Sequence, residues 1–143
     1  MPYEYLDDIA TSDAAFMAWG ETVEELFVAA AEATMNVMVG DLDTISPDQL
    51  RQIRVESDAV DMLLFELLQE LIFYKDAQRL LLRITALQVK KEGDHFFLSA
   101  EAHGEELNME KHDLVVDVKA VTLHRYRVEK TPQGWEAMVI LDI

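Results

Sequence analysis

The spacing of hydrophobic residues predicts two helices in the first half of the chain. Thr22-Val-Glu-Glu25 fits a capping box, in which the threonine hydroxyl accepts from a backbone amide and the glutamate reaches back to the helix start. Apolar residues then recur at helical spacing as far as Val37, and Gly40 is a natural stop. We expect a second helix from a cap at Asp58 to about Tyr74. Its apolar residues cover most of its circumference, which is typical of a central helix covered on several sides.

Alternation with a period of two predicts strands in the rest of the chain. Residues 3–19 have the character of extended and turn structure, and the expected strands are 52–56, 80–89, 95–103, 115–129 and 135–143. Glu92-Gly93-Asp94 and Gln133-Gly134 are expected to form the turns between neighbouring strands. Two early helices and a run of late antiparallel strands indicate a single α+β domain over residues 1–143. We expect two layers, with the two helices packed on a mainly antiparallel β-sheet.

The composition excludes several classes of protein. The chain has no cysteine, which rules out disulfides and zinc–thiolate sites and agrees with a cytoplasmic location. Its first residues contain neither a basic leader nor an apolar core, so no signal peptide is expected. The most apolar stretch, residues 62–74, contains Glu66 and Glu70 and is shorter than the roughly 20 residues that a bilayer span needs. We therefore expect no membrane role.

Charge is the strongest compositional feature. The chain has 28 acidic and 12 basic residues, which gives a formal net charge of −16. Such a field repels a polyanion, whereas proteins that bind nucleic acid normally present a basic face. Any role in RNA metabolism is therefore expected to act through a basic protein, with RNA contacted only indirectly. The acidity can equally serve solubility or a saline cytoplasm.

The sequence contains no strong catalytic motif. It has no glycine-rich phosphate loop, no HExxH and no Gly-x-Ser-x-Gly elbow, and its four histidines lack the spacing of zinc ligands. In the expected strand over 115–129, Val118, Ala120, Thr122 and His124 should share one face. Lys119 should lie on the other face with Val121 and Leu123, where it must reach water or pair with a carboxylate. A structural ion pair is the default expectation for Lys119.

Carboxylates at the two ends of the chain are candidates for a metal site. Asp7 and Asp8 repel each other unless a cation pairs with them. The side chain of Asp142 and the terminal carboxylate of Ile143 are adjacent, and with Asp8 they would supply three negative oxygen ligands. Ca²⁺, Mg²⁺ and Mn²⁺ prefer such ligands. The alternative is a solvated acidic loop beside a solvated chain end.

Several short motifs occur in the order and spacing of one known family, and the chain resembles the archeases over its whole length. The matching segments are Tyr3-Glu-Tyr-Leu-Asp-Asp-Ile9, Thr22-Val-Glu-Glu-Leu-Phe27, Met35-Asn-Val-Met38, Leu63 to Leu71, Gly104-Glu105, Lys111-His112, Val118-Lys-Ala-Val-Thr122 with His124, and Asp142-Ile143. Each motif is weak alone, and their common order makes the set specific. The chain departs from the family pattern at three positions, where Tyr5 replaces a histidine, Ala10 a glycine and Gln69 an asparagine.

The resemblance implies an accessory protein rather than an enzyme. Archeases activate the GTP-dependent tRNA ligase that joins 3′-phosphate and 5′-hydroxyl RNA ends. They promote its guanylylation and multiple turnover in tRNA splicing or RNA repair. The family also binds a divalent metal, commonly calcium, and its ligands correspond here to Asp8, Asp142 and Ile143. Lys119, His112 and Asp7 are expected to contact the partner or support this site.

Two other functions remain open. One is a chaperone or modulator of RNA-modifying proteins, a role also proposed for the archease family. The other is a metal-dependent hydrolase that uses Asp7 or Asp8 with a histidine. Metal-assisted hydrolysis needs an open coordination position and a positioned base, and the sequence does not identify that base.

Overall fold

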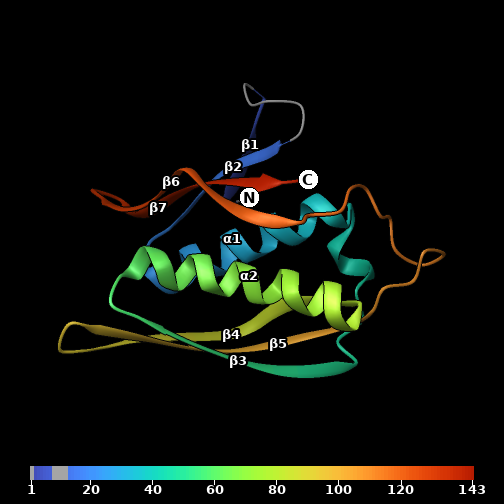
Figure 1. Ribbon diagram of the computed structural model, residues 1–143, viewed down its shortest axis with the longest axis horizontal. Helices are drawn as coiled ribbons and strands as arrows, with labels where there is room; N and C mark the ends of the chain where they lie inside the picture. Colours follow the sequence, from blue (N-terminus) through green and yellow to red (C-terminus); the bar gives the residue numbers. More distant parts are fainter. Residues whose placement is uncertain (1, 8–12) are drawn as a thin grey trace.

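Two helices lie between two antiparallel sheets in the computed structural model, which describes residues 2–7 and 13–143 (Figure 1). The helices are α1 (Val23–Met38) and α2 (Val60–Gln78), and a short 3₁₀ turn, η1 (Leu42–Thr44), follows α1. The strands are β1 (Tyr3–Leu6), β2 (Asp13–Gly20), β3 (Gln49–Ser57), β4 (Leu80–Glu92), β5 (His95–Glu106), β6 (Ala120–Thr131) and β7 (Gly134–Asp142). The predicted α+β class is confirmed.

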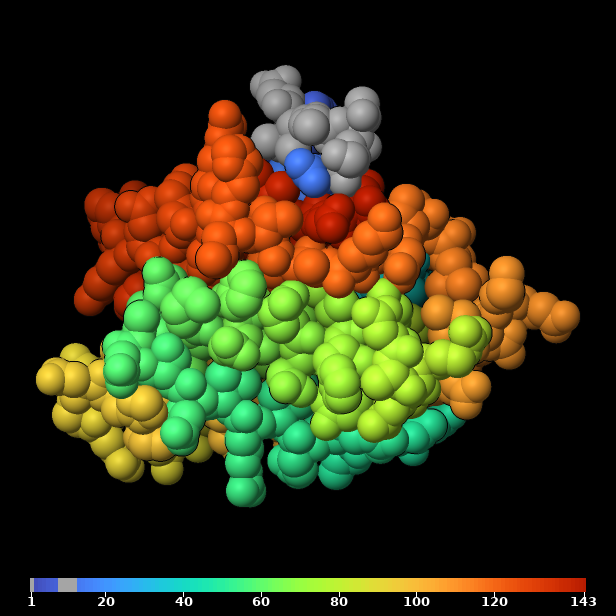
Figure 2. Space-filling model, in the orientation of Figure 1, coloured from blue at the N-terminus to red at the C-terminus, as the bar shows by residue number. Residues whose placement is uncertain are grey.

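The layers differ from the expected pair. The first sheet has the strand order β1-β2-β7-β6 and the second has the order β3-β5-β4, so the helices are covered from two sides. Helix α1 contacts β2 and β7 of the first sheet and β4 of the second, and α2 contacts β6 of the first and all strands of the second. A helix that is apolar around most of its circumference needs such cover. On the face shown in Figure 2, α2 reaches the surface between β6 and β3, and the loop 107–119 projects from one end.

One hydrophobic core joins the helices to both sheets. Its largest fully buried side chains include Leu26 and Phe27 of α1, Leu64 of α2, Phe16 of β2 and Leu81 of β4. Burial of each such side chain contributes about 1.5–3 kcal/mol. No helix in the described part of the chain is long and apolar enough to cross a membrane.

The start of α1 is the predicted capping box. Thr22 Oγ1 accepts from the Glu25 amide at 3.1 Å, and Glu25 Oε2 accepts from the Thr22 amide at 3.2 Å. Two amides that have no partner within the helix are therefore satisfied by side chains. This local arrangement fixes where α1 begins.

Replacing Thr22 with alanine should lower the free energy of unfolding by about 1 kcal/mol, because the Glu25 amide loses its acceptor. Urea denaturation measures this change. Thr22→Ser is the control, since serine keeps the hydroxyl. An alanine variant as stable as the wild type would show that the cap contributes nothing.

The expected cap of α2 is wrong. The helix begins after Ala59, which makes no side-chain cap, and Asp58 Oδ1 instead lies 2.6 Å from Nδ1 of His95. The carboxylate of Asp58 therefore joins the start of α2 to the tip of the β4–β5 hairpin. Hydrogen bonding to Asp58 raises the pKa of His95 above its usual value.

The predicted hairpin between β4 and β5 is confirmed. Its turn contains Gly93 with a φ of 62°, a conformation that glycine adopts without strain. At the other end of β5, a Cβ on Gly104 would lie only 1.7 Å from the carbonyl oxygen of Leu81. The Gly104 position therefore accommodates the close approach of two backbones, which any side chain would prevent.

The expected strand over 115–129 is shorter at its start, because α2 binds the backbone before β6. The buried ammonium of Lys75 donates to the Val118 carbonyl at 2.8 Å and pairs with Asp117 and Asp76. Burial alone would lower the pKa of Lys75, but the hydrogen bonds to Asp117 and Asp76 raise it. Gln69 Oε1 accepts from the Val121 amide at 2.9 Å. Asp117 and Val118 are thus held by α2, and the pairing of β6 with β7 begins only at Ala120.

The predicted alternation along this segment is also wrong. Val118 and Val121 are both buried, although they were expected on opposite faces, and Leu123 is exposed. The strand register shifts between Thr122 and Arg127, and Arg125 between them has a φ of 55°. Such an irregularity in one strand changes which side chains share a face.

Candidate functional site at the end of β7

Strand pairing brings two carboxylates together at the end of β7. Asp13 of β2 is the Cα partner of Asp142, and Ala120 of β6 lies opposite Asp142 on the other side. The next pairs along β7 place Ile140 in a small buried cluster with Ala15. That cluster is separate from the main core, so Asp142 and Asp13, which are two residues from it, share the outer face of the first sheet.

The sequence prediction did not include Asp13. The available signal was the alternation within residues 13–20, in which Phe16 and Ala18 are buried in the core. Asp13 begins the same strand at a position that alternates with them. The partner of this strand lies more than 100 residues away in the chain, so the pattern within 13–20 does not identify it. Register alone brings Asp13 beside Asp142.

The pairing of β2 with β7 places two acidic residues, Asp13 and Asp142, opposite each other. Like charges directly opposite each other in a sheet repel, and a cation between them removes the repulsion. Both residues are partly buried, and no basic side chain of the described residues forms an ion pair with either. Thr122, which lies opposite Ile140, has a buried Oγ1 with no hydrogen-bond partner within the described structure. Carboxylate and hydroxyl oxygens are ligands of the kind that hard divalent cations prefer.

The chain end is held by Lys119, the residue before β6. The main-chain oxygen of Asp142 accepts from the Lys119 amide at 2.8 Å, and Ile143 is partly buried against the core. The side chain of Lys119 is exposed, and the ion pairs found within residues 2–7 and 13–143 do not include it. The expected structural ion pair of Lys119 is therefore not found there. The exposed side chain of Lys119 instead projects from the backbone that holds Asp142.

The structure describes only some of the predicted metal ligands. Asp8 lies outside the described residues, as does Ala10, and Asp7 is exposed just after β1. Within the part of the chain that is described, no group of three or more histidine, aspartate or glutamate side chains is placed to hold a metal ion. The structure therefore brings together Asp142, Ile143 and the backbone of Lys119, and the set Asp8, Asp142 and Ile143 stays a prediction.

His112 belongs to a different cluster, around Glu105 at the end of β5. Glu105 Oε2 accepts from Lys111 Nζ at 2.6 Å, from the Ser46 amide at 2.7 Å and from His112 Nε2 at 3.0 Å. Nδ1 of His112 accepts from the Asn108 amide at 2.9 Å, which assigns the ring proton to Nε2. His112 is buried, so it supports the loop 107–119 and does not reach a partner.

The charge of Glu105 is strongly stabilised by this cluster. Burial would raise the pKa of the Glu105 carboxyl, but the hydrogen bonds from Lys111, the Ser46 amide and His112 outweigh burial and lower the pKa to about 2. The loop that these bonds hold leads directly to Lys119 and the end of β7. The Gly104-Glu105 and Lys111-His112 motifs thus meet in space as one structural unit.

Two departures from the archease pattern have structural roles here. Tyr5 donates from its hydroxyl to the Ala33 carbonyl at 2.7 Å, which joins β1 to α1. Burial raises the pKa of Tyr5, so its hydroxyl stays neutral in ordinary buffers. Gln69, as described above, holds the Val121 amide. Neither side chain belongs to the carboxylate pair of Asp13 and Asp142.

Comparisons of the sequence agree with this reading of the motifs. The profile of the archease protein family (MTH1598/TM1083) matches residues 3–143. The protein archease of Methanosarcina mazei is 34% identical over 142 residues, which cover 99% of this chain and 95% of the relative. The protein archease of Pyrococcus abyssi is 34% identical over 134 residues, which cover 93% of this chain and 94% of the relative.

Comparisons of the fold give the same result. The solution structure of protein 1598 from Methanobacterium thermoautotrophicum superposes with a TM-score of 0.85 at 32% identity and covers 99% of both chains. A crystal structure from Thermotoga maritima, described as an archease and possible chaperone, has a TM-score of 0.59 over 94% of this chain and 93% of that one. Its 17% identity supports the fold alone. On the family match over nearly its whole length, this chain belongs to the archease family.

Proposed function

We propose that this chain is a non-catalytic accessory protein of the GTP-dependent tRNA ligase that joins 3′-phosphate and 5′-hydroxyl RNA ends. In this role it promotes guanylylation and repeated turnover of the ligase in tRNA splicing or RNA repair, in the cytoplasm. The supporting observation is the juxtaposition of Asp13, Asp142 and the exposed Lys119 at one end of the first sheet. Of these residues Lys119 is exposed, and Asp13 and Asp142 are partly exposed.

A divalent cation, with calcium as the first candidate, fits the end of β7. The proposed ligands are Asp8, Asp142 and the main-chain carboxylate of Ile143, with Asp13 and Thr122 close by. A bound cation would supply positive charge that offsets the repulsion between the carboxylates. The chain's own contribution is rigidity, because the Lys119 amide fixes the backbone of Asp142.

The proposed partner surface is basic and lies near the nucleotide site of the ligase. The net charge of −16 favours such a surface and disfavours direct contact with RNA. Lys119 is the exception in this acidic region, and its position beside Asp142 suits contact with a phosphate or a carboxylate of the partner. Attraction between opposite charges would speed the encounter at low salt.

Ligase guanylylation and multiple-turnover RNA joining, measured with and without this protein, test the proposal. We expect stimulation that falls several-fold as ionic strength rises from about 50 to about 300 mM, because screening weakens the encounter. Lys119→Met should reduce stimulation, whereas Lys90→Met, an equal change of charge on the exposed part of β4, should not. If the wild type leaves an active ligase unchanged, the proposal is wrong.

A chaperone or modulator role is the second candidate. The loop 107–119 exposes Met109 and Val115, and such apolar side chains suit contact with varied clients. Affinity capture from cell extract separates the two functions, since a dominant ligase supports the first and many unrelated partners support the second. Phosphoesterase assays of the isolated protein test the remaining possibility of a metal-dependent hydrolase.

A further inference from the structure

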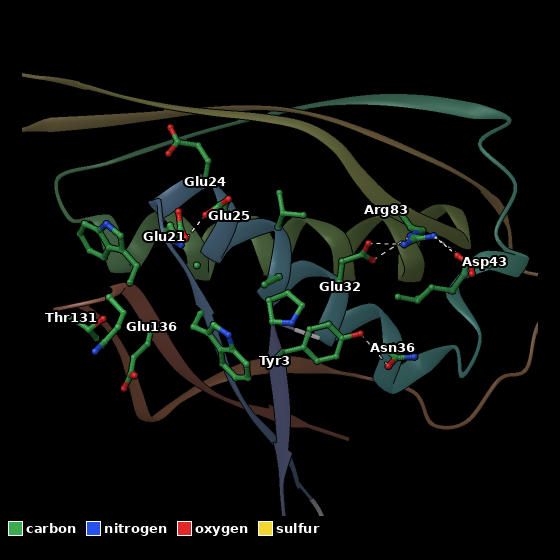
Figure 3. Close-up of a pocket in the computed structure, with 18 of the residues that line it drawn as sticks. Tyr3, Glu21, Glu24, Glu25, Glu32, Asn36, Asp43, Arg83, Thr131 and Glu136 are labelled. Carbon is green, nitrogen blue, oxygen red and sulfur yellow. Dashed lines mark hydrogen bonds and ion pairs between the residues drawn. The ribbon is translucent and has the colours of Figure 1, made fainter.

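A long groove runs along the exposed side of α1, between the edges of the two sheets (Figure 3). Its volume is about 1250 Å³. Glu21 and Thr131 lie at one end, Tyr3 lies near the middle, and Arg83 and Asp43 lie at the other end. The groove therefore extends over nearly the whole length of the helix.

The groove carries a large excess of negative charge. Among the described residues, seven acidic side chains and a single basic one, Arg83, line it. The guanidinium of Arg83 is already engaged, because it binds Glu32 through two nitrogens at 2.7 and 3.2 Å and lies 3.3 Å from Asp43. Glu21 and Asp41 have no cationic partner among the described residues. This field attracts a cationic ligand and repels nucleic acid.

Aromatic side chains add a second recognition element. The chain has two tryptophans, Trp19 and Trp135, and both line the groove. Trp19 is 42% exposed. Indole rings bind the guanidinium of arginine and the ammonium of lysine through cation–π contacts, and tryptophan often dominates the energy of protein interfaces. A groove with carboxylates and indoles suits basic side chains carried on a peptide.

The length of the groove defines the size of its ligand. From Glu24 to Asn36, both of which line it and lie in α1, the helix advances 12 residues, which at 1.5 Å per residue is about 18 Å. An extended peptide rises about 3.3 Å per residue, so about five or six residues fill that distance. We propose that this groove binds an extended basic segment of a partner protein, with arginine or lysine side chains directed at its carboxylates and indoles.

The groove is separate from the carboxylate pair at the end of β7. Asp13 begins β2, and Tyr3, which lines the groove, pairs with Ala18 of the same strand, so about 17 Å of strand lies between them. The proposal therefore does not depend on a ligase being the partner. A second copy of this chain is a poor occupant, because the chain has a net charge of −16 and no run of more than two adjacent basic residues.

Intrinsic tryptophan fluorescence reports directly on this groove, because both tryptophans line it. The probe is an acetylated, amidated octapeptide of alternating arginine and alanine, titrated into the full chain at about 150 mM salt. An octapeptide with glutamine in place of arginine is the control ligand. We expect a saturable change in emission with the arginine peptide and no change with the glutamine peptide.

Matched variants locate the binding surface. Glu21→Gln with Glu24→Gln removes two groove charges, and glutamine keeps an acceptor for the Val89 amide that Glu24 now binds. We expect this pair to weaken peptide binding about tenfold. Asp48→Asn with Glu110→Gln removes two exposed charges outside the groove, and we expect less than a twofold effect.

Three results would overturn the proposal. One is the absence of any emission change, and another is equal weakening by the two pairs of variants, which would indicate a diffuse charge effect. The third is a dimer in sedimentation velocity that Trp19→Ala dissociates, which would assign the groove to a second copy. Circular dichroism and thermal unfolding establish that each variant is folded. Failure of the ligase assay alone leaves this inference intact.

Discussion

Asparagine in place of Asp142 should weaken calcium binding and reduce stimulation of the ligase, each by at least about tenfold. Asp142 is the one proposed metal-ligating side chain that the structure places, and it faces Asp13 across the sheet. Asparagine keeps the size of the side chain and the backbone hydrogen bond from Lys119, so the fold should be retained. Isothermal titration calorimetry with calcium and the guanylylation assay measure the two effects. Asp48→Asn, which removes an exposed charge elsewhere, should change neither.

The sign of the stability change separates a metal ligand from a structural carboxylate. Without metal, Asp142→Asn removes a repulsive pair and should leave the melting temperature unchanged or raise it. With saturating calcium, the wild type should gain stability that the variant does not gain, because binding to the folded state alone is stabilising. A variant that is less stable in chelator would indicate a structural role for Asp142 and contradict the metal proposal.

The contribution of Ile143 needs a different change. In the proposal its main-chain carboxylate is a ligand, so a few residues added after Ile143 should reduce calcium affinity as much as Asp142→Asn does. The same residues added before Met1 provide the control. Full calcium affinity in the C-terminally extended protein would remove Ile143 from the ligand set and leave the side-chain carboxylates to be tested alone.

Local features of the sequence predicted the elements that local contacts form. The cap at Thr22 joins residues three positions apart, and the turn at Gly93 joins neighbouring strands, so both follow from short patterns. Asp58 had the type and position of a cap and was nevertheless assigned wrongly. Its carboxylate binds His95, which is 37 residues away in the chain. The local sequence does not show that a residue far along the chain competes for a capping side chain.

The second sheet and the pairing of Asp13 with Asp142 depend on contacts between residues that are far apart in the sequence. A pattern within a short segment does not predict such contacts. Alternation of apolar and polar residues indicates where a strand lies, but it does not identify the strand beside it. Here β7 pairs with β2, which lies near the other end of the chain. The shortened start of β6 has the same kind of cause, since the buried Lys75 of α2 binds the Val118 carbonyl. The apolar surface around most of α2 did predict that the helix is covered on several sides. Strands of both sheets cover it.

Glutamine in place of Glu105 should lower the free energy of unfolding by about 2–3 kcal/mol at neutral pH. The Glu105 carboxylate accepts three hydrogen bonds, from Lys111, the Ser46 amide and His112, and its side chain is only 14% exposed. A shift of its pKa from 4.5 to about 2 corresponds to about 3 kcal/mol, since one pKa unit is about 1.4 kcal/mol. Glutamine keeps an acceptor but loses the charge that strengthens all three bonds.

The pH dependence distinguishes this charge effect from a packing effect. The folded-state pKa of Glu105 is lower than its unfolded value, so the stabilisation is complete above pH 4.5 and is lost as the pH falls towards 2. Urea denaturation from pH 7 to pH 3 should therefore show the wild type and Glu105→Gln converging. Glu106→Gln, the exposed neighbour, should change stability by less than about 0.5 kcal/mol at any pH. A constant difference between wild type and Glu105→Gln across this range would assign the loss to shape rather than to charge, and His112 would then support the loop by packing alone.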